Sequence, residues 1–247
     1  MISTTYIAII LLATLSGITT LIGVTLALYF KKSVKGVVIG VGFSAGIMLA
    51  ISFFELLPES IGATSKIKAI SALILGFLFI LILHFIVPHM HLVEEKGKLG
   101  KIMRIGYLVS FGIILHDFPE GFAMANSYIF APALGVLVAI SIALHNIPEE
   151  FAMAIPLVLT KKKWFLIKLA LLSALAEPLG AILGLFAVSL APALNPLFMA
   201  FAAGAMIFIS INELLPLART YKRTDLFAIG IALSLVVYWI LTLFIPG

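Results

Sequence analysis

The sequence predicts an all-α membrane protein with eight transmembrane helices, because 63% of its 247 residues are hydrophobic and only 11% are charged. A water-soluble domain of this length needs far more polar surface. The chain is better counted in bilayer crossings of about 20 residues each. We therefore expect a single polytopic domain over residues 1–247, surrounded by the lipid bilayer.

Apolar windows define the eight predicted spans. They cover approximately residues 5–30, 35–57, 69–88, 102–126, 132–158, 164–190, 194–218 and 225–245. The first window lacks the basic leader of a cleaved signal peptide, so we expect it to be a permanent span. The chain contains no cysteine, which excludes a disulfide framework and a thiolate metal site.

Lysine and arginine residues lie mostly in alternate connections between the predicted spans. Fourteen of the sixteen fall between spans one and two, three and four, five and six, or seven and eight, and only Lys66 and Lys68 lie on the opposite side. The positive-inside rule places these connections in the cytoplasm and both termini outside it. The net charge of +5 thus reflects membrane topology and predicts no nucleic-acid partner. We expect a multi-pass protein of the cell membrane, and one chain leaves a homodimer open.

Two stretches of the chain repeat each other. Residues 42–58 match residues 200–216 at ten of seventeen positions, and both copies end in Glu-Leu-Leu-Pro. An odd number of crossings separates them, so the two copies run in opposite directions, as in inverted-repeat transporters. The sequence therefore predicts a 3+2+3 arrangement in which spans 1–3 and 6–8 form an inverted repeat. Shared lipid-facing composition is the alternative, but it does not explain Glu-Leu-Leu-Pro in register.

A polar motif occurs twice within the apolar runs of spans four and five. Residues 116–120 read His-Asp-Phe-Pro-Glu and residues 145–149 read His-Asn-Ile-Pro-Glu. A charged side chain at such a depth costs about 2.5–3.5 kcal/mol, so the carboxylates need a partner. A divalent metal ion is the partner most compatible with His, Asp, Asn and Glu together. Each proline also frees a backbone carbonyl four residues earlier and opens room for ions or water.

The spacing predicts two adjacent metal positions. Within each motif, the histidine and glutamate share one helical face, whereas the Asp or Asn is turned by about 100°. The first position would hold His116, Glu120, His145 and Glu149, and the second would hold Asp117, Asn146 and Glu177, with the two motif glutamates able to bridge. The imidazoles favour Zn²⁺, Fe²⁺, Mn²⁺, Co²⁺ or Cd²⁺ over Mg²⁺ and Ca²⁺. Packing is an alternative role for any single member, but not for a set that converges on three spans.

The segments at 116–121, 145–150 and 176–180 resemble signature segments of the ZIP family of divalent metal transporters. The Glu-Leu-Leu-Pro segments resemble its bacterial zinc-uptake branch. The resemblance implies metal entry into the cytoplasm through a binuclear site formed by the seven residues above. The chain departs from the family pattern at Asp117, where Asn is commoner, and at Glu150, where Gly is usual. We therefore rank Glu150 as a secondary candidate.

Further polar residues are weaker candidates for the metal pathway. Glu55 and Glu59 lie at the outer end of span two, and Asn212 and Glu213 lie toward the inner end of span seven. Capping and interfacial anchoring are their alternative roles. His89 and His91 belong to a short cytoplasmic loop, residues 89–101, that would collect released metal or simply form a solvated face. We expect His84 to be a packing residue.

The rival hypothesis from another class is an intramembrane metal-dependent hydrolase or oxidase, which would also bury histidines and carboxylates. The chain has no His-Glu-x-x-His, and every strong acid at the centre is already a predicted ligand, so no general base is free. A metal-sensing receptor without transport does not explain the inverted repeat. The sequence therefore predicts a transporter of Zn²⁺ or related dications and no enzyme.

Overall fold

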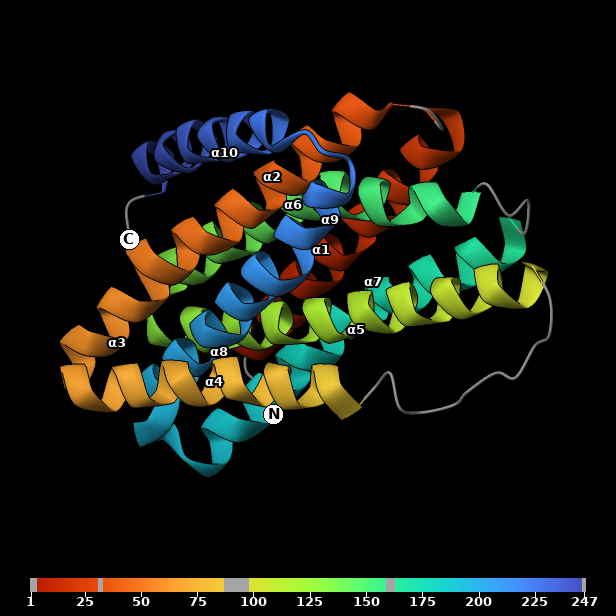
Figure 1. The fold of residues 1–247 in the computed structure, drawn as a ribbon. Coiled ribbons are helices and arrows are strands. Elements are labelled where there is room, and N and C mark those ends of the chain that lie inside the picture. The colour runs from red at the N-terminus through yellow and green to blue at the C-terminus, as the bar shows by residue number, and fades with distance from the viewer. Residues whose placement is uncertain (1–3, 31–32, 87–97, 159–162, 246–247) are drawn as a thin grey trace.

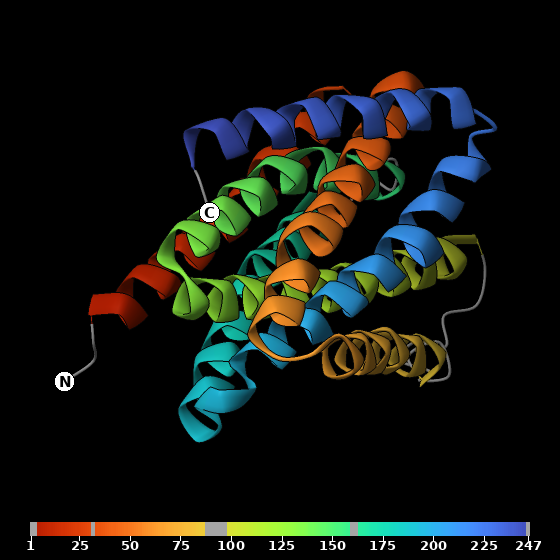
Figure 2. The same ribbon diagram turned by 90° about the vertical axis from the view of Figure 1, so that its left-hand side faces the viewer.

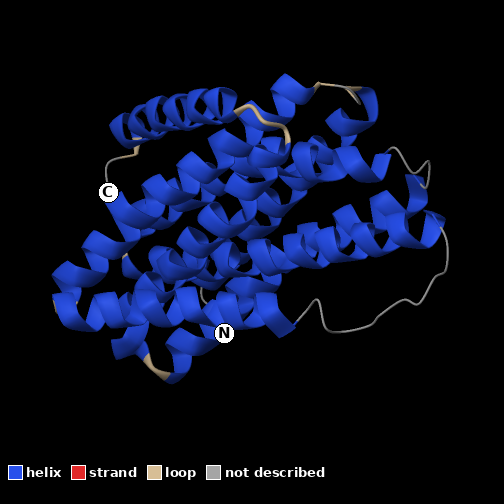
Figure 3. Cartoon of the chain, viewed as in Figure 1, coloured by secondary structure: helices blue, strands red, loops and turns tan. Residues whose placement is uncertain are grey.

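The computed structural model describes residues 4–30, 33–86, 98–158 and 163–245. Within these ranges the chain is helical with short connections and contains no strand, as Figure 3 shows. The predicted all-α class is therefore confirmed. His89 and His91, with most of the predicted loop 89–101, lie outside the described residues.

The helices follow one another closely along the chain (Figure 1). In order they are α1 (Thr4–Tyr29), α2 (Val34–Ala50), η1 (Ile51–Leu56), α3 (Leu57–Ala63), α4 (Lys66–Ile86), α5 (Lys98–Phe130), α6 (Pro132–Val158), α7 (Lys163–Leu190), η3 (Pro192–Leu194), α8 (Asn195–Ile209), η4 (Ser210–Leu214), α9 (Leu215–Thr220) and α10 (Thr224–Phe244).

Within the described residues, seven stretches are long and apolar enough to cross a membrane. They are Thr4–Tyr29, Val34–Ala63, Lys66–Ile86, Pro132–Ile155, Leu166–Leu190, Pro192–Thr220 and Thr224–Phe244. The remaining long helix, α5, has 33 residues and carries the first copy of the polar motif. Most side chains of α5 before His116 lie outside the described part of the structure.

The two Glu-Leu-Leu-Pro segments share a local geometry that the sequence analysis did not predict. Both η1 and η4 are π-helical, and each residue of the first copy corresponds to the residue 158 positions later in the second. The Leu57 N–H donates to the Ser52 carbonyl, and the Leu215 N–H donates to the Ser210 carbonyl. A proline follows each segment and removes one backbone donor, which favours a widened turn at that point.

The packing of the helices repeats in the same way. Helix α1 packs along α6 as α7 packs along α5, and α10 packs on α2 as α4 packs on α8. Figures 1 and 2 show α10 and α4 on opposite sides of the bundle. Buried positions on α4 correspond, by the same shift of 158, to buried positions on α10: Ala69 to Phe227, Ala72 to Gly230, Gly76 to Ser234, and Ile80 to Tyr238. The two outer helices therefore use equivalent faces.

Four helices form the centre of the bundle. α5 packs against both α6 and α7, and α1 completes the group by packing against α6 and α7. α2 contacts this group through α6, and α8 contacts it through α5. The two copies of the polar motif therefore lie side by side in the interior, between the two repeated segments.

Candidate metal centre

The polar residues predicted as metal ligands are buried where α5, α6 and α7 meet. None of the seven central candidates is more than 4% exposed, and Glu150 is buried to the same degree. In a membrane protein, ionisable side chains buried this deeply need partners inside the bundle. Their location points to a shared role rather than to separate packing positions.

Two glycines allow α5 and α7 to approach closely at this level. A Cβ added to Gly121 would lie 1.9 Å from the carbonyl oxygen of Glu177, and one added to Gly180 would lie 2.1 Å from that of Phe118. Neither overlap can be relieved by rotating a side chain, because both involve backbone atoms. Small residues serve this purpose at membrane helix contacts. They bring Glu177 of α7 next to the motif on α5.

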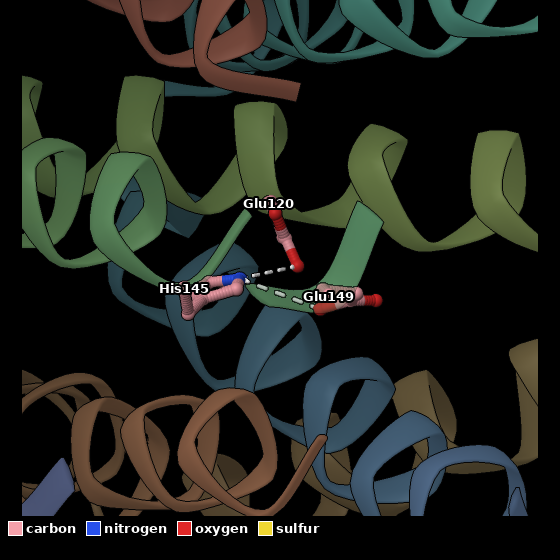
Figure 4. Close-up of side chains that lie close together, drawn as sticks. All are labelled: Glu120, His145 and Glu149. Atoms are coloured by element: carbon pink, nitrogen blue, oxygen red, sulfur yellow. Dashed lines mark hydrogen bonds and ion pairs between the residues drawn. The ribbon is translucent and has the colours of Figure 1, made fainter. Parts of the chain in front are cut away.

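Three ligand atoms converge at the centre of the site. Figure 4 shows Glu120 of α5 reaching toward His145 and Glu149 of α6. The Nε2 atom of His145 lies 3.1 Å from Glu120 Oε1 and 4.0 Å from Glu149 Oε2. One ligand atom from each of the three residues lies within 4.8 Å of the other two. This spacing suits a single small cation held between them.

The ring of His145 is oriented by its own helix. Its Nδ1 atom lies 3.0 Å from the Ser141 carbonyl oxygen. Because a carbonyl can only accept, Nδ1 carries the hydrogen, and Nε2 is the atom that faces the carboxylates. A backbone acceptor behind the imidazole fixes the tautomer in this way at many metal sites.

His116 lies between the group of Glu120, His145 and Glu149 and a further acid, Glu213. Its Nδ1 atom is 3.7 Å from Glu149 Oε1, and its Nε2 atom is 2.9 Å from Glu213 Oε2. Glu213 also lies 3.8 Å from His84 Nδ1. The sequence analysis placed Glu213 on the pathway but did not predict its contact with His116. His84 packs against Phe208, as expected of a packing residue, but its ring also contacts Glu213.

The residues predicted for the second metal position form two hydrogen-bonded groups. Asn146 donates to Glu177 and to the Ser16 carbonyl oxygen, the latter over 3.4 Å. Asp117 is instead bonded to the Ser173 hydroxyl, which lies 2.5 Å from Glu150 Oε1. A hydroxyl has one hydrogen, so Ser173 can donate to only one of the two carboxylates at a time.

The sequence analysis missed Ser16 and Ser173. A single serine in an apolar helix carries no signature of its own. The signal that could have found them is the correspondence of α1 with α7, in which the shift is 157 residues. Under that shift Ser16 corresponds to Ser173 and Gly23 to Gly180, and both glycines face the central residue of a polar motif.

Several buried nitrogen and oxygen atoms of the site have no hydrogen-bond partner within the described structure. They are the Nδ1 atom of His116 and one carboxylate oxygen each of Glu120, Glu149 and Glu177, whereas Nε2 of His116 is paired with Glu213. Buried polar groups are almost always paired, and an unpaired group within a bilayer costs several kcal/mol. Imidazole nitrogens and carboxylate oxygens are ligands of Zn²⁺ and related dications. The residues present therefore fit a transition-metal ion.

Three of the secondary candidates, Glu55, Glu59 and Asn212, have surroundings other than the central ligands. Glu55 accepts a hydrogen bond of 2.5 Å from the hydroxyl of Tyr238 on α10. Glu59 is exposed on α3. Asn212 is exposed and donates over 3.3 Å to the Phe208 carbonyl of its own helix. Glu213, in contrast, contacts the predicted central ligand His116, and Glu150 shares the Ser173 hydroxyl with Asp117.

Comparison with known proteins identifies the family. The ZIP zinc transporter family model matches residues 88–244. A protein named zinc transporter ZupT from Chlorobium limicola is 40% identical, over 93% of this chain and 95% of its own length. Proteins of the same name from Corynebacterium aurimucosum and Streptococcus mutans are 38% and 36% identical, over 84% and 90% of this chain and 86% and 91% of their own lengths. The chain therefore belongs to the ZIP family of zinc transporters.

Proposed function

We propose that this protein takes up divalent transition-metal ions, with Zn²⁺ as the main cargo, into the cytoplasm. The ZIP family consists of transporters, so the alternative of a metal-dependent hydrolase or oxidase is set aside. The observation that carries the proposal is the group of buried imidazole and carboxylate atoms without partners. A dication at the bundle centre would satisfy these atoms together. Fe²⁺, Mn²⁺, Co²⁺ and Cd²⁺ share this ligand preference and are expected competitors.

The cargo site is proposed to be binuclear. Glu120, His145 and Glu149 already converge, and rotation of His116 away from Glu213 would complete the first position. The second position would use the remaining central candidates, Asp117, Asn146 and Glu177, with the bridging glutamates. Asp117 reaches it by exchanging its bond to Ser173 for the metal.

The proposed membrane arrangement has eight spans, with α5 as the span in addition to the seven that meet the criteria of length and hydropathy. The repeated packing supports the 3+2+3 arrangement, in which α5 and α6 lie between the inverted repeats. With both termini outside, the Arg219–Arg223 connection is cytoplasmic. Glu213 and His84 then lie between the site and the cytoplasm, and Glu213 would receive the ion from His116 on release.

Metal uptake by purified protein in proteoliposomes tests the proposal. We expect Zn²⁺ uptake to be inhibited by Fe²⁺, Mn²⁺, Co²⁺ and Cd²⁺, and not by Mg²⁺. Replacing a central ligand, as in Glu120→Gln or His145→Ala, should reduce uptake by more than about a hundredfold, since even indirect supports of a metal ligand matter by 10–100-fold. Asp225→Asn is the matched control, because Asp225 is exposed and paired with Arg223. Near-normal uptake by both ligand variants would refute the site.

A further inference from the structure

Glu55 and Glu213 occupy equivalent positions in the repeated segments but have different partners. Each is in a π-helical segment, and they are 158 residues apart, as are the other matched positions. Glu213 contacts His116 at 2.9 Å, at the edge of the metal site. Glu55 is instead bonded at 2.5 Å to Tyr238, which is itself buried and stacked on Phe54.

The residues around the two acids correspond as well. The polar motifs on α5 and α6 match with a shift of 29 residues, so His116 corresponds to His145 and Gly112 to Ser141. A Cβ added to Gly112 would lie 3.6 Å from Glu213 Oε2, which places position 112 beside this acid. Helix α8 packs on α5 as α2 packs on α6. The pseudo-symmetry that relates Glu213 to Glu55 therefore also relates Gly112 and His116 of α5 to Ser141 and His145 of α6.

On α6, the equivalent position carries a hydrogen-bond donor without a partner in the described structure. The Ser141 hydroxyl is buried and has no hydrogen-bond partner among the described residues. It lies one helical turn before His145, whose ring bonds the Ser141 carbonyl. If the Glu55 carboxylate of η1 approached α6 as the Glu213 carboxylate of η4 approaches α5, it would accept a hydrogen bond from this hydroxyl and contact the imidazole of His145.

We propose that Glu55 is a further cargo-contacting residue, which leaves Tyr238 and contacts Ser141 and His145 in the opposite access state. This inference rests on the proposed transport function. The pseudo-symmetry gives the two states nearly equivalent backbone packing, so the repeats can exchange conformations at little cost. Glu55 then passes the entering ion to His145, as His116 passes the leaving ion to Glu213. Glu55 and Glu213 both lie within the π-helical segments, η1 and η4, and π-helical turns recur at functional sites.

Cysteine cross-linking tests the contact directly, because the native chain contains no cysteine. The test pair is Glu55→Cys with Ser141→Cys, and the matched pair is Glu213→Cys with Gly112→Cys. Both pairs leave His116, His145 and the other central ligands intact. In membranes treated with a short thiol-specific cross-linker, we expect both pairs to react and the four single variants to give no intramolecular cross-link.

A third pair, Glu55→Cys with Tyr238→Cys, reports the contact seen in this structure. If the matched pair and this third pair react but the test pair does not, the inference is overturned while the proposed function stands. If wild-type protein in proteoliposomes takes up no Zn²⁺, the proposed function fails whatever the cross-links show. Size-exclusion chromatography confirms that each variant is folded.

A kinetic measurement adds a second, independent test. Glu55→Gln should raise the KM for Zn²⁺ uptake about tenfold, the loss expected for one charge-assisted contact. The exposed Asp225→Asn variant again serves as control. An unchanged KM in Glu55→Gln would contradict a role for Glu55 in contacting the cargo.

Discussion

The side chains at the centre of the bundle combine strong metal ligands with polar groups that restrain them. His145 is oriented by the Ser141 carbonyl, and Asn146 is bonded to Glu177. Asp117 and Glu150, the two departures from the family pattern, converge on one hydroxyl, that of Ser173. The two residues that add negative charge to the site thus share one hydroxyl, which donates to only one of them at a time.

Removing that donor should destabilise the protein. Ser173→Ala leaves two buried carboxylates without a hydroxyl partner, which costs about 1–3 kcal/mol. We expect a lower midpoint of thermal unfolding in detergent, partly restored by Asp117→Asn in the same chain, because that change removes one of the charges. Ser189→Ala is the matched control, since Ser189 is exposed on the same helix. Equal midpoints for Ser173→Ala and Ser189→Ala would contradict the role assigned to Ser173.

The sequence predicted which residue types gather at the centre but not every contact. Histidine and glutamate four residues apart fix a common face, so Glu120, His145 and Glu149 could be grouped from spacing. The partner of Asp117 could not, because Ser173 lies on another helix and its pairing depends on how α5 and α7 dock. The contact of Glu213 with His116 depends likewise on tertiary packing.

At the scale of the elements, the close approach of α5 and α7 positions Glu177. Gly121→Ala would place a Cβ 1.9 Å from the Glu177 carbonyl oxygen, so the helices must separate. We expect a loss of about 1–3 kcal/mol in stability, typical of overpacking, and reduced Zn²⁺ uptake. Thermal unfolding and proteoliposome uptake measure the two effects.

A matched control exists in the same chain. Gly62→Ala makes the same chemical change at a position where an added Cβ would meet nothing within 4 Å. It should leave both stability and uptake close to wild type. If Gly121→Ala behaves like Gly62→Ala, close packing at this contact is not what positions the ligand.

The helices were readable from apolar windows, but their irregularities were not. In the π-helical segments η1 and η4, backbone N–H groups bond the carbonyl five residues earlier in place of the one four residues earlier. The hydropathy of the sequence does not distinguish these two hydrogen-bonding patterns. The following proline gives a hint, because it removes a donor, but the same residue can also produce a simple kink. The prolines in α5 and α7 lie inside continuous helices.

At the scale of the whole molecule, the proposed inverted repeat relates positions on opposite faces of the membrane. Gly62 and Thr220 are 158 residues apart and lie in the last turns of α3 and α9, which are equivalent helices. In an inverted repeat, one of them faces outward and the other faces the cytoplasm. The match of residues 42–58 with 200–216 predicted this relation and, with it, the pairing of span one with span six. Which residue of α1 corresponds to which residue of α7 was read from the packing.

Thiol labelling tests this topology. In intact cells, Gly62→Cys should react with a membrane-impermeant maleimide, and Thr220→Cys should react only after permeabilisation. The unmodified chain is the control, because it has no cysteine. Labelling of both positions from the same side would contradict the inverted arrangement.

X-ray absorption spectroscopy of the zinc-loaded protein tests the central claim, that buried acids and imidazoles at the bundle centre hold the dication. We predict nitrogen and oxygen ligands at about 2.0–2.2 Å, with an imidazole signal that weakens in His145→Ala and zinc retention that falls in Glu120→Gln. A purified protein that retains no zinc, or a zinc spectrum unchanged by both substitutions, would contradict the account.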